Sequence, residues 1–145
     1  ELSFTNNKGE KERPVVIHRA ILGSTERFMG IMIEHFAGNF PLWLAPVQVV
    51  VLPVAEAHNA YAEKVRDELL ALGVRVELDS SNDSLGKRIR TAKTQKTPYI
   101  LVLGDKEVAD GTVTAERRGT EKGEVHSLAE FIASVKTDVT EKKIW

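Results

Sequence analysis

The chain of 145 residues contains no cysteine. Disulfide bridges and zinc sites built only from cysteine are therefore excluded, and the composition fits a reducing compartment. No apolar run approaches the roughly 20 residues that cross a bilayer, and no signal peptide opens the chain. We therefore expect a cytoplasmic protein that has no membrane partner.

An excess of one charge is also lacking, since the formal net charge is −1. A nearly neutral protein has no overall attraction to nucleic acid. The charges are unevenly distributed, however, because residues 85–96 carry no acidic residue and five basic ones, namely Lys87, Arg88, Arg90, Lys93 and Lys96. Such a helix can bind a phosphate backbone, but a basic run taken alone is more often a solvated helix face. Composition leaves both interpretations open.

A glycine-rich phosphate-binding loop is missing as well. The first predicted strand-to-helix turn, residues 53–57, reads Pro-Val-Ala-Glu-Ala and has an acidic residue where an anion would sit. A small stand-alone nucleotide-binding α/β enzyme is therefore disfavoured.

The first part of the chain has the pattern of two strands and a helix. Leu2–Thr5 and Val15–Ile21 are predicted strands, joined by a polar hairpin at residues 6–11. Two strands alone are marginal in water, so they are expected to belong to a larger sheet. A helix is predicted over residues 25–37, ended by the Gly-Asn-Phe-Pro sequence that follows. We expect residues 1–23 to be poorly anchored, unless the helix over Phe28–Phe36 packs on the α/β domain.

From Pro46 onward, apolar runs alternate with amphipathic segments. Strands are predicted at residues 47–52, 74–78 and 99–103, and helices at 57–72, 84–96 and 128–135. The Asp110-Gly111 dipeptide predicts a hairpin, and Ser127 with Glu130 forms a capping box for the last helix. The resulting order of elements predicts an α/β fold, a three-layer sandwich with a mixed, mainly parallel sheet.

In open parallel sheets, ligands bind at the carboxyl ends of the strands. Those ends carry residues 79–82 and 104–107, so Asn82 and Glu107 are predicted on one rim, beside the start of the basic helix. Amide and carboxylate groups suit hydrogen bonding to the base edges of single-stranded RNA. The alternative is that Asn82 is only a helix cap and Glu107 only a turn residue.

Residues 13–28, Arg-Pro-Val-Val-Ile-His-Arg-Ala-Ile-Leu-Gly-Ser-Thr-Glu-Arg-Phe, closely resemble motif 3 of the class II aminoacyl-tRNA synthetases, in the form found in threonyl-tRNA synthetases. Residues 46–135 resemble the anticodon-binding domain of the histidyl, glycyl, prolyl and threonyl enzymes. Its best-marked pieces are residues 43–48 and 99–107. The resemblance covers nearly the whole chain. It implies a catalytic-domain remnant at 1–41, a linker at 42–46 and an anticodon-binding domain at 47–145.

The resemblance also implies roles for three residues of the motif 3 segment. Arg27 would contact the terminal phosphate of ATP, and Ser24 would lie at the wall of the substrate pocket. His18 would be one of three zinc ligands, the others being a Cys and a His outside this chain. The isolated chain is therefore not expected to bind zinc tightly. No such pattern surrounds the other histidines, which we interpret as structural, namely His35, His58 and His126.

For RNA, the resemblance implies that Asn82 and Glu107 contact anticodon bases. The basic residues expected near phosphates are Lys87, Arg88, Arg90 and Lys93. A further family residue, an Arg in the strand after the Asp-Gly turn, falls on Glu116 in this chain. Either Arg117 or Arg118 takes over that contact, or the contact is made differently.

The function implied by the resemblance is that of a carboxyl-terminal portion of threonine-tRNA ligase. The full-length parent would be a homodimer that activates threonine with Mg-ATP and transfers it to threonine tRNA. This chain has no motif 1 or motif 2, so it is expected to be inactive alone while binding the anticodon. The alternative is a non-catalytic synthetase-like module that binds tRNA or a protein, against which the complete motif 3 argues.

Overall fold

The computed structural model describes residues 1–120 and 122–144, and the chain divides into two compact units between Met32 and Ile33. In the first unit, strands β1 (Phe4–Thr5) and β2 (Lys11–Glu12) pair antiparallel. Helix α1 (Thr25–His35) begins in this unit and ends in the next. The β1–β2 turn is closed by Asn6, whose side-chain oxygen accepts hydrogen bonds from the backbone N–H groups of Lys8 and Glu10 at 2.9 and 3.0 Å.

The predicted strand at Val15–Ile21 is wrong. The described residues contain no strand there, and Val15 and Ile17 are 90% and 81% exposed. A strand needs a partner for its backbone groups, and no described strand pairs with this segment. The predicted hairpin turn is confirmed, but it joins β1 to residues 11–12 instead.

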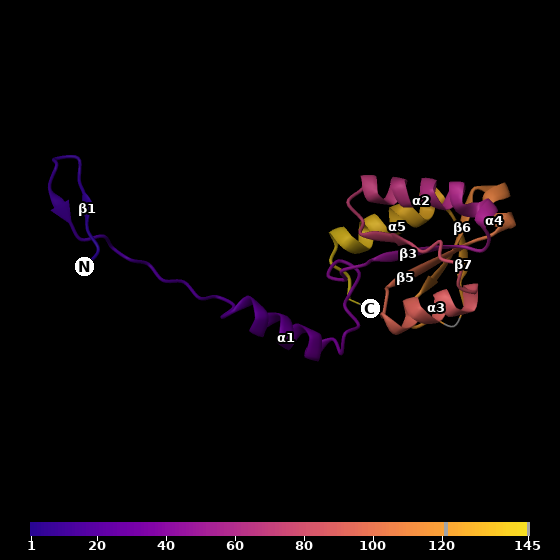
Figure 1. Ribbon diagram of the computed structural model, residues 1–145, viewed down its shortest axis with the longest axis horizontal. Helices are drawn as coiled ribbons and strands as arrows, with labels where there is room; N and C mark the ends of the chain where they lie inside the picture. Colours follow the sequence, from indigo (N-terminus) through magenta and orange to yellow (C-terminus); the bar gives the residue numbers. More distant parts are fainter. Residues whose placement is uncertain (121, 145) are drawn as a thin grey trace. The chain divides into compact units, whose positions relative to one another are not determined.

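The second unit is an α/β sandwich (Figure 1). Its strands are β3 (Val49–Pro53), β4 (Val76–Leu78), β5 (Tyr99–Leu103), β6 (Thr112–Arg117) and β7 (Glu124–Ser127). Its other elements are the 3-10 turn η1 (Glu56–His58), α2 (Asn59–Ala71), α3 (Leu85–Thr94), α4 (Asp105–Asp110) and α5 (Leu128–Thr140).

Within the described residues, the sheet order is β4-β3-β5-β6-β7. β3 is parallel to both β4 and β5, whereas β6 pairs antiparallel with β5 and with β7. Four strands therefore run one way and β6 the other, which confirms the predicted mixed sheet. β3 lies between two partners and is buried along its whole length, as its β-branched run predicts.

Two apolar layers hold the sandwich together. On one face, α2 and α5 cover the sheet, and the core there includes Leu69 and Phe131 (Figure 1). On the other face, α3 packs Ala92 against Val50 and Ile100. The three-layer arrangement is therefore confirmed. The segment predicted as a linker packs within this unit, since Leu42 and Ala45 are buried.

The hairpin predicted at Asp110-Gly111 is wrong, because residues 105–110 form helix α4. Glu107 accepts a hydrogen bond from the Gly104 N–H and so caps the start of the helix. Gly111 ends it in the left-handed conformation, at φ 66°, which glycine adopts without strain. The Ser127–Glu130 capping box is confirmed, although α5 continues beyond its predicted end at Val135. No helix in the described part of the chain is long and apolar enough to span a bilayer.

Candidate nucleic-acid interface

Three loops meet at the carboxyl ends of the parallel strands. Residues 54–58 follow β3, residues 79–83 follow β4, and residues 104–107 follow β5. The register aligns these ends, because Val51 pairs with Leu78 and Pro53 pairs with Leu103. Asn82 and Glu107 therefore lie on the loops at one rim, as the order of elements predicts.

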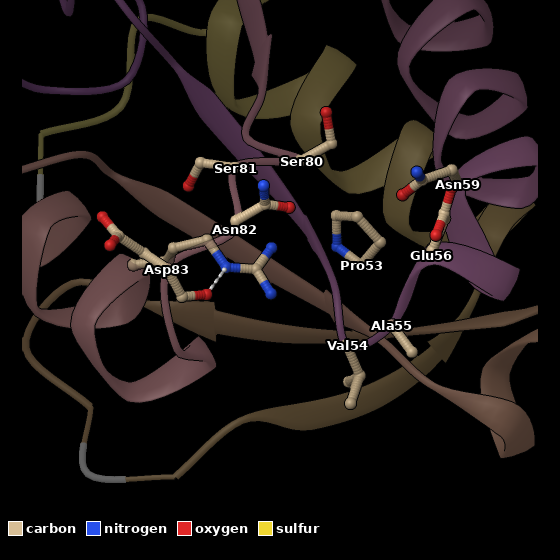
Figure 2. Close-up of a pocket in the computed structure, with 10 residues that line it drawn as sticks. Pro53, Val54, Ala55, Glu56, Asn59, Ser80, Ser81, Asn82 and Asp83 are labelled. Atoms are coloured by element: carbon tan, nitrogen blue, oxygen red, sulfur yellow. Dashed lines mark hydrogen bonds between the residues drawn. The ribbon is translucent and has the colours of Figure 1, made fainter.

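A hollow of about 300 Å³ opens between the loops that follow β3 and β4. It is lined by Pro53, Val54, Ala55, Glu56, Asn59, Ser80, Ser81, Asn82, Asp83 and Arg88. Figure 2 shows the Asn82 amide directed toward Pro53, with Asn59 and Glu56 on the far side. The lining is rich in hydroxyl, amide and carboxylate groups, which can hydrogen-bond to the edge of a nucleobase.

The loop that carries Asn82 is held in place by Arg88 of α3. This guanidinium is buried, and it donates hydrogen bonds to the Asp83 carbonyl at 3.2 Å and the Asp79 carbonyl at 2.8 Å. The Asp79 side chain in turn accepts a hydrogen bond from the Ser81 N–H at 3.0 Å. Arg88 therefore supports the rim, a role that only the folded structure reveals because its partners are carbonyls.

Glu107 is a partly buried carboxylate with two donors. Thr114 donates its hydroxyl at 2.7 Å, and the Gly104 N–H donates at 2.9 Å. Partial burial acts to raise the pKa of Glu107, but these hydrogen bonds outweigh it and hold the pKa below its usual value. A Cβ atom on Gly104 would lie 3.4 Å from both Glu107 and Val54. Glu107 is not one of the residues that line the hollow, so it shares the carboxyl rim with Asn82 but lies outside the hollow itself.

A buried histidine ties two of the rim loops together. The His58 Nδ1 atom accepts a hydrogen bond from the Ala55 N–H at 3.1 Å. Its proton is therefore on Nε2, which donates to Asp105 at 2.9 Å. This bond joins η1, after β3, to the start of α4, after β5. The two residues are 47 positions apart, so no local pattern could have predicted the contact.

The remaining basic residues of α3 differ in their surroundings. Lys87 is exposed and pairs with Asp83 at 2.9 Å, and Arg90 is also exposed. Lys93 pairs with Glu116, the β6 residue at the position of the missing family Arg. An exposed ion pair is weak, so Asp83 offsets little of the positive charge of Lys87. Lys87 and Arg90 are therefore the basic residues of α3 whose charge is least neutralised by neighbouring groups.

The structure does not bring Arg117 and Arg118 to this rim. The register of β6 pairs Thr114 with Val102 but pairs Arg117 with Tyr99, the first residue of β5. Arg117 therefore lies at the amino end of β5, opposite to the carboxyl rim. Arg118 donates to the carbonyl groups of three residues, Lys96, Asn39 and Phe40. Burial lowers the pKa of the Arg118 guanidinium.

The motif 3 residues lie in the first unit. The Ser24 hydroxyl accepts a hydrogen bond from the Arg27 N–H at 3.2 Å and so caps α1. The side chains of His18 and Arg27 are exposed. One imidazole cannot hold zinc alone, and the described residues contain no group of three or more His, Asp or Glu suited to a metal ion. The described residues therefore do not form a zinc site by themselves.

The family model described as an anticodon-binding domain matches residues 48–138. The chain therefore belongs to the anticodon-binding domain family, which confirms the resemblance of the α/β unit. It is 48% identical over 145 residues to the threonine–tRNA ligase of Desulforamulus reducens, covering 99% of this chain and 22% of that protein. It is 49% identical over 144 residues to the enzyme of Acidobacterium capsulatum, covering 98% and 21%.

A solved structure supports the same relationship. The RNA-binding domain of threonyl-tRNA synthetase from Cryptosporidium parvum matches with a TM-score of 0.78 and 38% identity, over 90% of this chain and 33% of that one. The chain thus spans about 22% of the length of the curated relative from D. reducens. The chain is thus similar to threonine–tRNA ligases over only part of their length.

Proposed function

We propose that this chain is part of a threonine–tRNA ligase and that its α/β unit binds the anticodon of threonine tRNA. The observation that carries the proposal is the polar hollow at the carboxyl rim, in a unit of the anticodon-binding domain family. Asn82 would hydrogen-bond to a base edge, and Glu107 would accept from base N–H groups. Lys87 and Arg90 would attract the RNA backbone, while Arg88 would act indirectly by holding the loop of Asn82.

The proposal extends to the complete enzyme. That enzyme would be a cytoplasmic homodimer that activates threonine with Mg-ATP and transfers it to tRNA, with Arg27 toward ATP and Ser24 beside the substrate. The 145-residue chain alone would have no ligase activity. His18 would need ligands from outside this chain to hold zinc.

The test is a binding titration with threonine tRNA and with the same tRNA altered in the anticodon, at two salt concentrations. The native chain should prefer the native anticodon. Asn82→Ala should remove about 1–3 kcal/mol of that preference, the usual cost of a lost base contact. Glu107→Gln should also reduce it, because Gln keeps the helix cap but removes the charge.

Asn7→Ala is the matched control, since Asn7 is an exposed residue of the first unit. It should leave the preference unchanged. Equal and strongly salt-dependent binding of the two tRNAs by the native chain would reject the proposal. The non-catalytic binding module would then be the better account.

A further inference from the structure

The segment between α1 and β3 is held by polar side chains of the α/β unit. We call residues 37–46 of this segment the junction, and all of them lie within the second unit. The backbone carbonyl groups of the junction accept hydrogen bonds, donated by Lys96 to Ala37, by Arg118 to Asn39 and Phe40, by Gln48 to Leu42, and by Arg75 to Trp43 and Ala45. The junction is therefore fixed on the unit along most of its length, which a flexible linker would not be.

The first of these contacts joins the carboxyl ends of two helices. A backbone hydrogen bond that reaches back into the helix closes each end, donated by the Gly38 N–H for α1 and by the Thr97 N–H for α3. The residues before these donors, Ala37 and Lys96, have the left-handed conformation, at φ 48° and 59°. The Lys96 ammonium group donates to the Ala37 carbonyl, at the negative end of the α1 dipole.

Lys96 is held through both its side chain and its backbone. Left-handed backbone is unfavourable for residues other than glycine, so it persists only where neighbouring contacts compensate for it. The Lys96 side chain packs over Gly38, where an added Cβ atom would lie 3.4 Å from the Cδ and Nζ atoms of the lysine. The Lys96 carbonyl accepts a hydrogen bond from Arg118 at 2.7 Å. These contacts fix Lys96 against the junction.

Helix α3 connects the junction to the anticodon rim. Arg88, near its start, holds the loop of Asn82, and Lys96 follows its end. A helix of 10 residues is about 15 Å long. Because a helix of this length bends little, the rim and the junction keep a fixed separation.

We infer that Lys96 is a positioning residue for the binding of tRNA, since it holds the end of α1, residues 33–37, on the unit that carries the rim. The inference rests on the proposed function, in which one tRNA contacts both the rim and the catalytic part of the complete enzyme. A rigid connection raises the effective concentration of the second contact once the first has formed. Lys96 would therefore increase the affinity for whole tRNA without touching it.

The first arm of the test uses the chain by itself and does not depend on the proposed function. Lys96→Met removes the ammonium group, so the amide protons of Ala37, Gly38 and Asn39 should exchange roughly tenfold faster. Lys96→Arg keeps a donor and should restore most of the protection. The matched control is Lys136→Met, because Lys136 is an exposed lysine of α5. Unchanged exchange in Lys96→Met would overturn the inference.

The second arm uses the complete ligase, with whole threonine tRNA and its isolated anticodon stem-loop as the two probes. Lys96→Met should weaken the binding of whole tRNA roughly tenfold, because the two contact regions are no longer rigidly connected. Binding of the stem-loop should be unchanged, since the stem-loop contacts the rim alone. The activation of threonine, measured as pyrophosphate exchange with ATP, should also be unchanged. Lys96→Arg should bind whole tRNA as the native enzyme does.

The outcomes separate this inference from the proposed function. An equal loss for the two probes would show that Lys96 acts at the rim, and unchanged binding of whole tRNA would show that the junction does not position it. Either result overturns the inference. The proposed function fails instead if the native enzyme binds stem-loops with native and altered anticodons equally. A loss of whole-tRNA affinity in Lys96→Met that Lys96→Arg restores would support the positioning role even then.

Discussion

Two apolar segments of similar composition differ in whether they are buried. Val15–Ile17 in the first unit is exposed and unpaired among the described residues, whereas Val49–Leu52 in the second unit is buried between two strands. Both are β-branched runs that predict a strand. The comparison shows that a β-branched run can form a strand, but that it becomes paired and buried only where other segments of the chain pack against it.

Hydrogen exchange should give the largest contrast between these segments. Amides of β3 should exchange only when the α/β unit opens globally, so they should be protected roughly a thousandfold or more. Amides of residues 15–22 should exchange at nearly the rate of an unfolded peptide. The measurement is exchange followed by mass spectrometry or NMR, and slow exchange throughout residues 1–23 would contradict the expected weak anchoring.

Truncating one apolar side chain in each unit should change the free energy of unfolding by different amounts. Leu101→Ala removes a fully buried side chain from β5 and should cost about 2–5 kcal/mol of unfolding free energy, because it leaves a cavity. Ile17→Ala changes an exposed side chain and should cost less than about 0.5 kcal/mol. Denaturant unfolding monitored by circular dichroism gives both values. Similar costs for the two variants would show that Ile17 is packed in the native chain.

Two arginines extend the comparison to polar groups. Arg88→Ala leaves the carbonyl groups of Asp79 and Asp83 without their donor, and should cost about 1.5–3 kcal/mol. Arg27→Ala removes an exposed side chain, so unfolding should stay within about 0.5 kcal/mol of native. Both are measured by denaturant titration. An equal and small effect would mean that Arg88 does not support the loop of Asn82.

Two serine caps should give a smaller difference. Ser127→Ala removes the hydroxyl that accepts from the Glu130 N–H and donates to the Glu130 carboxylate, and should cost the α/β unit about 1 kcal/mol. Ser24→Ala should lower the helicity of α1 without changing the unfolding transition of the α/β unit. Thermal melts and helical circular dichroism separate the two effects. A shift of the main transition by Ser24→Ala would tie α1 to the stability of that unit.

The smallest expected effect is the acid response of Glu107. Because its folded pKa is lowered, this carboxylate contributes stability above its unfolded pKa and loses it as the pH falls through the folded pKa. Thr114→Val removes one of its donors. The variant should therefore lose less stability than native on acidification, in unfolding experiments at neutral and acidic pH. An identical pH dependence would exclude Thr114 as the cause of the lowered pKa.

Much of the α/β unit is predictable from local pattern. Strand β5 has the predicted bounds Tyr99–Leu103, because its run of large apolar residues lies between a Pro and a Gly. The hairpin prediction at Asp110-Gly111 failed because the same Gly can close a turn or cap a helix. The Glu107 side chain that caps the start of α4 decides between them.

The candidate site is predictable only in outline. Element order places Asn82 and Glu107 on one rim, since parallel strands end at a common edge. Element order cannot show that Arg88 hydrogen-bonds to backbone carbonyl groups. Nor can it show that the register of β6 places Arg117 at the amino end of β5, away from the rim. Both outcomes depend on contacts between distant segments, which local periodicity does not encode.

The central claim is that the carboxyl rim of the α/β unit reads the anticodon. Its most direct test is to titrate the isotope-labelled chain with a short RNA that has the sequence of the threonine tRNA anticodon loop, and to follow the amide signals by NMR. The account predicts the largest shifts at residues 79–83 and 104–107, with residues 15–22 unaffected. Shifts that spare the rim and concentrate elsewhere would contradict it.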